Sequence, residues 1–233
     1  MPAANSRPTL PLLLSLNAGF VDTAGFLALQ GLFTAHVTGN FVTLGASLVF
    51  GTSGAVAKLL ALPVFCLVVM LTRLISSALL RLNRPALKII LGLKVVFLVA
   101  GAVLAIRLGP FADGDAWQAV VTGMVLVAAM AIQNAAHRIH LGTAPPSTVM
   151  TGTTTQIMID LADMVHAPTV ENAAAPGARL LAMSTNIAVF AAGCAAAALL
   201  YAHVGVWCFV VPPVLGMATL FLRAAGGRGR NSA

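Results

Sequence analysis

Residues 17–40 decide how this chain folds, and they read NAGFVDTAGFLALQGLFTAHVTGN. They place Asp22 inside an apolar segment and then interrupt that segment with a polar break from Thr34 to Asn40. A second and shorter apolar run starts at Phe41. An acidic residue followed by a polar break between two apolar runs is the feature on which most of the functional interpretation depends.

The composition indicates a membrane protein. Of the 233 residues, 59% are hydrophobic and only 8% are charged, whereas soluble domains carry roughly 25% charged residues. With so few charges, lipid must be part of the solvent around the fold. The net charge is +7, but the basic residues are scattered between apolar segments. Nucleic-acid binding would need a basic face, so we expect no nucleic-acid partner.

Apolar segments of about 20 residues, the length that a helix needs to cross the hydrocarbon core, predict an all-α, polytopic integral membrane protein. The six predicted transmembrane helices are residues 10–30, 59–80, 89–108, 117–139, 178–202 and 204–222. Two further apolar runs, residues 41–50 and 151–164, are too short to span and are expected to be re-entrant, interfacial or buried. The whole chain, 1–233, is interpreted as a single transmembrane domain with a basic tail at 223–233.

The distribution of charge predicts the orientation. With six spans and a cytoplasmic N-terminus, the inner side holds nearly all of the basic residues, as the positive-inside rule requires. These are Arg7, Arg81, Arg84, Lys88, Arg138, Arg179, Arg223, Arg228 and Arg230. If the two short runs also spanned, the cluster at 81–88 would move outside. We therefore predict six spans, both termini in the cytoplasm, the first short run at the outer side and the second at the inner side.

The two halves of the chain look like a repeat. A shift of 113 residues lays residues 34–40 on residues 147–153, and one gap lays Asp22 on Asn134. Each half, about 10–110 and 115–225, has one span, one short run and two more spans. Three spans is an odd number, so the halves would be two inverted three-span repeats. Transporters use this architecture and bind substrate near the midplane. A duplication that gives only a structural bundle is the alternative.

Paired motifs in the two halves resemble the YoaK-like family of bacterial inner-membrane proteins. The first half carries the motif in residues 19–40, and the second half carries it in Gln133-Asn134-Ala135 and in residues 149–153. The resemblance covers nearly the whole chain. It implies a six-span, multi-pass protein of the bacterial inner membrane, and it assigns no activity.

Asp22 is the sharpest single candidate, because ionisable residues at mid-span usually face the bundle and mark ion or substrate pathways. It either binds a proton or cation, or it has a structural role in pairing with a buried base or capping the break. Arg73 is a candidate charge partner, although it can also snorkel to the interface. Lys94 lies six residues past Lys88, and we expect it to snorkel.

The other candidate substrate- or ion-binding residues are polar or flexible and lie in or beside the two breaks. They are His36, Thr38, Gly39, Asn40, Gln133, Asn134, Thr151, Gly152 and Thr153. His36 can relay protons near neutral pH, or it is an ordinary loop histidine at the interface. The two Thr-Gly pairs stand where helices would start, so their N–H groups offer a dipole site. Ordinary helix capping is the alternative interpretation.

The sequence predicts no metal, no cofactor and no enzymatic activity. His137 and His140 have metal-ligand spacing, but no third ligand is near them in the sequence, and a structural zinc site needs four. There is no phosphate-binding loop and no spacing typical of a catalytic triad.

We therefore expect a small-molecule or ion transporter or channel in the bilayer, coupled to a cation or proton through Asp22. An intramembrane enzyme acting on a lipid-soluble substrate through Asp22 and His36 is one alternative. A non-catalytic membrane scaffold or sensor is another. A six-span unit is small for a transporter and is compatible with a homodimer.

Overall fold

The computed structural model describes residues 10–166 and 174–227, without the side chains of 174–176 and 223–227, and every regular element in these ranges is helical. Arg7, Arg228 and Arg230, which contributed to the predicted orientation, lie outside the described residues. The helical fold confirms the predicted class of a polytopic helical membrane protein.

Five stretches of the described chain are long and apolar enough to cross a membrane. The first four are α1 (Leu10–Ala28), α3 (Ala55–Arg81), α4 (Ala86–Leu108) and α5 (Trp117–His140), and they match the first four predicted spans. The fifth, Gly177–Leu222, is 46 residues long and contains both of the remaining predicted spans.

That last stretch corrects one predicted boundary. The prediction placed the start of the sixth span at Val204, but α7 (Ala174–Val204) is followed by a 3₁₀ helix, η2 (Gly205–Val210), and α8 (Val211–Gly227) begins only after it. Gly205 adopts φ +56°, a left-handed conformation that glycine tolerates and that ends a helix. Pro212 and Pro213 then occupy the first turn of α8, where the missing N–H groups have no intrahelical role.

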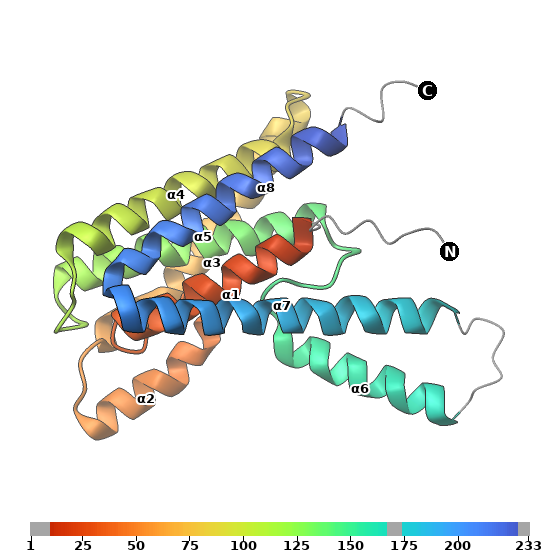
Figure 1. The fold of residues 1–233 in the computed structure, drawn as a ribbon. Coiled ribbons are helices and arrows are strands. Elements are labelled where there is room, and N and C mark those ends of the chain that lie inside the picture. The colour runs from red at the N-terminus through yellow and green to blue at the C-terminus, as the bar shows by residue number, and fades with distance from the viewer. Residues whose placement is uncertain (1–9, 167–173, 228–233) are drawn as a thin grey trace.

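The long helices pack in pairs. α1 lies along α7, α3 lies along α5, and α4 contacts both α5 and α8 (Figure 1). Glycines allow α1 and α7 to approach very closely. A β-carbon on Gly19 would lie 2.2 Å from the carbonyl oxygen of Phe190, and one on Gly193 would lie 2.2 Å from that of Leu16. Small residues are the usual means of close helix packing in membranes.

The two short runs form helices outside this pairing. α2 (Asn40–Phe50) follows a 3₁₀ turn, η1 (Val37–Gly39), and packs on α3, whereas α6 (Met150–His166) packs on α7. In Figure 1 they lie at opposite ends of α7. Polar contacts anchor both: Lys58 Nζ donates to Ser47 Oγ at 2.6 Å, and Arg179 pairs with Asp160.

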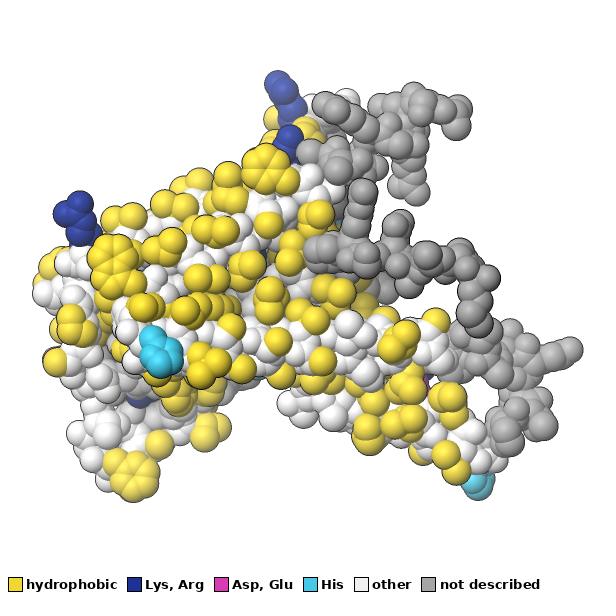
Figure 2. All heavy atoms as spheres, viewed as in Figure 1, with side chains coloured by type: hydrophobic (Ala, Val, Ile, Leu, Met, Phe, Trp, Pro, Cys, Tyr) yellow, Lys and Arg dark blue, Asp and Glu magenta, His cyan; other side chains and the backbone are white. Residues whose placement is uncertain are grey.

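The outer surface is apolar along the lengths of the helices. Large hydrophobic side chains such as Leu74, Val96 and Phe221 are exposed. Figure 2 shows apolar side chains spread over the visible face, with few basic ones. Contact with the lipid bilayer explains why such a surface is stable.

Candidate functional site

The first break is created by a left-handed turn after α1. The N–H of Leu29 donates to the Gly25 carbonyl, and that of Gly31 donates to the Phe26 carbonyl, both at 2.9 Å. Gln30 and Gly31 have φ of +52° and +83°, a combination that ends helices and reverses the chain. The chain then folds back along α1, where the Thr34 methyl packs so closely on Gly25 that a β-carbon would lie 2.8 Å from it.

Asp22 holds the folded-back segment. Its side chain is buried, and its Oδ1 accepts hydrogen bonds from the backbone N–H groups of Thr34 at 2.7 Å and Ala35 at 2.6 Å. A longer contact of 3.5 Å comes from the N–H of His36. A carboxylate that accepts several backbone N–H groups acts as a cap. This geometry agrees with the structural alternative for Asp22, in which the carboxylate caps the break.

The second carboxylate oxygen of Asp22 pairs with a base. His36 Nδ1 lies 2.6 Å from Asp22 Oδ2, and the imidazole side chain is 35% exposed. Its ring meets the ring of Phe190 edge-on at 5.5 Å. Since a carboxylate can only accept, Nδ1 carries the proton in this contact. Asp22 therefore supports the break through one oxygen and a titratable side chain through the other.

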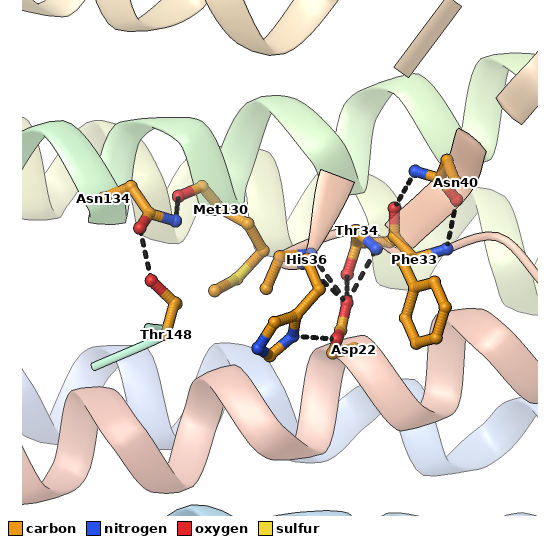
Figure 3. A network of polar contacts seen from close by, with 9 residues as sticks. Asp22, Phe33, Thr34, His36, Asn40, Met130, Asn134 and Thr148 are labelled. Carbon is orange, nitrogen blue, oxygen red and sulfur yellow. Dashed lines mark hydrogen bonds and ion pairs between the residues drawn. The ribbon is translucent and has the colours of Figure 1, made fainter. Parts of the chain in front are cut away.

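The surroundings of His36 favour its charged form. The hydrogen bond that His36 donates to Asp22 holds the pKa of His36 above its usual 6.5, although burial acts to lower it. The negative charge of Asp22 and the backbone of Thr148 also raise this pKa. Thr148 belongs to the second break, and Figure 3 shows the His36 ring between Asp22 and Thr148. The two breaks therefore come together at His36.

The second break has the same design with neutral groups. Asn134 Oδ1 on α5 accepts a hydrogen bond from the Thr148 hydroxyl, while its Nδ2 donates to the Met130 carbonyl at 3.0 Å. The neighbouring Gln133 donates to the Leu14 carbonyl at 2.9 Å and to Ser147 Oγ at 3.2 Å. A mid-helix side chain again holds the segment that folds back, but here the side chains that hold it, Asn134 and Gln133, are amides that carry no charge.

Each break borders its own pocket. The pocket at the first break, called here the Asp22 pocket, has a volume of about 450 Å³ and is lined by Asp22, Thr23, His36, Phe190 and Cys194 among others. The pocket at the second break, the Asn134 pocket, has a volume of about 440 Å³ and is lined among others by Asn134, His137, Ala144, Ser147 and Thr148. His36 lines the first and Thr148 lines the second, so the contact between the breaks lies between the two pockets.

Most of the residues predicted at the starts of the short helices lie outside the linings of these two pockets. Gly39 lines the Asp22 pocket, but Thr38 is exposed outside its lining, and the Asn40 amide forms two 2.8 Å hydrogen bonds with the Phe33 backbone. In the second half, Thr151 and Gly152 are exposed. The Thr153 hydroxyl donates to the Val149 carbonyl of its own helix. Thr151 instead lines a separate hollow of about 690 Å³ along α6, together with Thr154 and Thr155.

One of the two interpretations of Arg73, and the expectation for Lys94, are wrong. The charge partner of Asp22 is His36 and not Arg73, whose side chain is exposed on α3. Arg73 is exposed on α3 eight residues before Arg81, a position from which its long side chain can snorkel towards the inner interface. Lys94 does not snorkel, because α4 lies against α5 and α8 and the lysine is fully buried on this face.

No role was expected for Asn17, and His137 and His140 were considered only as a metal pair. Asn17 is fully buried, with neither amide atom bonded within the described chain. Its place five residues before Asp22, inside the same apolar segment, was the only signal that could have identified it. The two histidines bond separately: His137 Nε2 lies 3.4 Å from the Ala144 carbonyl oxygen, and His140 Nε2 lies 3.0 Å from Ser76 Oγ.

Comparison with known proteins agrees with the motif resemblance. A family model described as protein of unknown function (DUF1275) matches residues 10–222. A stretch of 48 residues is 52% identical to the UPF0700 transmembrane protein YoaK of Bacillus subtilis (strain 168). That alignment covers 21% of this chain and 21% of the relative's length. No solved structure matches the chain.

Proposed function

The chain belongs to the DUF1275 family of membrane proteins, and we propose that it is a small-molecule or ion transporter or channel and not an enzyme. The Asp22–His36 pair is its proton- or cation-linked element. The two breaks and their pockets form its pathway.

The observation that carries the proposal is the 2.6 Å contact between His36 and a buried, mid-helix carboxylate, Asp22, in the lining of a pocket. A mid-membrane ionisable pair is costly, and such pairs typically mark proton or ion pathways. Because Asp22 also holds Thr34 and Ala35, a change in the protonation of the pair changes the support of the break. The pair thus couples charge to backbone conformation.

The packing supports two inverted halves. α1 packs on α7 as α5 packs on α3, and α2 packs on α3 as α6 packs on α7. α1 also contacts α8 as α5 contacts α4. Each pairing is related to the other by exchanging the halves, which is what a pseudo-two-fold repeat requires. The matched contacts of Asp22 and Asn134 add a second, independent line of support.

Alternating access follows from the two pockets. In the predicted orientation, the second half of α1 lies towards the outer side and the second half of α5 towards the inner side. The Asp22 pocket then belongs to the outer half of the membrane and the Asn134 pocket to the inner half. The His36–Thr148 contact separates them, so rocking of one half against the other would open each pocket in turn.

The proposal includes six crossings in the bacterial inner membrane, with α8 as the sixth and both termini cytoplasmic. α1 begins and α8 ends at the same end of the molecule (Figure 1), as an even number of crossings requires. A homodimer in the membrane is part of the same proposal.

Flux in proteoliposomes tests the function. Sodium and proton fluxes would be compared for the wild type, Asp22→Asn and Asn134→Ala. Asparagine keeps an oxygen that accepts from Thr34 and Ala35 but removes the charge, so the variant should fold. We expect it to lose pH- or sodium-dependent flux, whereas Asn134→Ala keeps the dependence. Full dependence in a folded Asp22→Asn protein would refute the proposal.

An intramembrane enzyme is the second candidate, because it requires Asp22 and His36 to lie within hydrogen-bond distance, and they do. An aspartate that orients a histidine is the arrangement of a general base. Conversion of a lipid-soluble substrate in detergent micelles, where no flux exists, would favour this candidate. A passive scaffold is less well supported, because Asp22 lines a pocket and is not paired with Arg73.

A further inference from the structure

A buried lysine lies away from the two breaks. Lys94 is 0% exposed, and its Nζ has no hydrogen-bond partner within the described chain. It shares the buried face of α4 with Leu91, Val95 and Leu98. An ammonium group in such surroundings is very costly unless something pairs with it.

Asn17 on α1 faces the same region. Its side chain is 0% exposed, and both amide atoms lack a partner among the described residues. A β-carbon built on Gly216 of α8 would lie 3.0 Å from Val95 Cγ2, 3.2 Å from Leu98 Cδ1 and 4.0 Å from Asn17 Nδ2. Lys94 is the neighbour of Val95 and stands one turn before Leu98, so lysine and asparagine flank the same junction of α1, α4 and α8.

The acidic side chains in the described ranges are engaged or exposed elsewhere. Asp22 accepts from residues 34–36, and Asp160 pairs with Arg179. Asp115 accepts from the N–H groups at the start of α3. Asp113 lies in the same loop as Asp115, and Asp163 is exposed on α6. Within the described residues, Lys94 therefore has no carboxylate to neutralise it.

We propose that Lys94 and Asn17 bind a compact monovalent anion, a small carboxylate or a halide, at the junction of α1, α4 and α8. The ammonium supplies charge and three donors, and the amide supplies two donors. The apolar side chains around the junction exclude bulky anions. Neither residue lines the Asp22 or the Asn134 pocket, so the site is separate from the proposed pathway and does not depend on transport.

Thermal unfolding of the purified full chain in detergent tests the site. The melting temperature would be followed by tryptophan fluorescence in sodium acetate, sodium chloride or sodium gluconate at constant ionic strength. Gluconate serves as the bulky anion. At about 100 times the Kd, a bound anion should raise the melting temperature by about 5–10 °C. A rise in acetate alone identifies a carboxylate site, and a rise in chloride alone identifies a halide site.

Matched variants assign the effect to the residues. Lys88 lies on the same helix but is exposed, so Lys88→Met should keep the full rise. Lys94→Met should abolish it, and it should fold because an apolar isostere suits a buried site. Asn17→Ala should reduce the rise and gives a second test if Lys94→Met is unstable. The proposal would be overturned if the melting temperature of the wild type did not rise. It would also be overturned if Lys94→Met and Asn17→Ala both showed the same rise as the wild type.

Discussion

The two breaks share one geometry and differ in chemistry. In the first, a carboxylate on α1 holds backbone N–H groups and a histidine. In the second, an amide on α5 holds one hydroxyl. The shared geometry supports the fold of both halves, whereas only in the first break is the side chain that holds the folded-back segment itself ionisable. The comparison indicates that the hydrogen-bonded geometry serves the fold, whereas the charge of Asp22 is what coupling to an ion would use.

The largest expected difference is in stability. Asp22→Ala leaves the buried N–H groups of Thr34 and Ala35 without an acceptor and removes the partner of His36, so it should cost about 3–5 kcal/mol. Asn134→Ala removes the acceptor of one hydroxyl and should cost about 1 kcal/mol. Chemical unfolding in detergent measures both. Equal losses of unfolding free energy in the two variants would show that Asp22 and Asn134 support their breaks equally, and would contradict the difference between the breaks.

The next largest effect is on the close packing of α1, the helix that carries Asp22, against α7. Gly19→Ala would place a methyl group 2.2 Å from the Phe190 carbonyl oxygen, and we expect a loss of about 1–3 kcal/mol from overpacking. The offset that lays Asp22 on Asn134 lays Gly19 on Ala131, so α5 already carries the methyl group. Gly92→Ala is the control, because no atom lies within 4 Å of its added β-carbon. A harmless Gly19→Ala would contradict the close contact of α1 and α7.

A smaller effect distinguishes the breaks by pH. The pKa of His36 is raised in the folded protein, so its contribution to stability is complete below the unfolded pKa of about 6.5. The contribution is lost as the pH rises through the higher folded value. The melting temperature of the wild type should exceed that of His36→Gln most at pH 5.5, and the gap should narrow above pH 6.5. Thr148→Ala should show a gap that does not vary with pH, and a constant gap for His36→Gln would contradict the account.

The smallest effect concerns the short helices. Arg179→Met removes the ion pair that joins α7 to Asp160 on α6. The Asp160 side chain is buried but keeps its 2.7 Å hydrogen bond from Gln156, and an ion pair with a largely exposed arginine contributes little to stability. We expect faster hydrogen exchange in α6 with little change in melting temperature. Lys58→Met removes a buried contact to Ser47 and should affect α2 more. A larger effect at α6 than at α2 would reverse this ranking.

The sequence predicted the parts of this structure that depend on local pattern. Apolar length gave the first four long helices, and the position of Asp22 before a polar break identified the centre of the site. It named Arg73 as the charge partner of Asp22 and joined His36 to Asp22 only in the enzyme alternative, because the left-handed turn at Gln30 and Gly31 decides where His36 lies. Whether Lys94 snorkels or is buried depends on the helices that pack against α4, and the spacing between Lys88 and Lys94 does not reveal those helices. The late start of α8 was readable from Pro212 and Pro213.

The central claim is that the two breaks border one pathway, with the Asp22 pocket open to the outside and the Asn134 pocket open to the inside. Single cysteines at Thr23 and at Ala144, introduced after replacing Cys66, Cys194 and Cys208, test it directly with a membrane-impermeant maleimide. We expect Thr23→Cys to react in right-side-out vesicles and Ala144→Cys to react in inside-out vesicles. Reaction of both from the same side, or of neither from any side, would contradict the account.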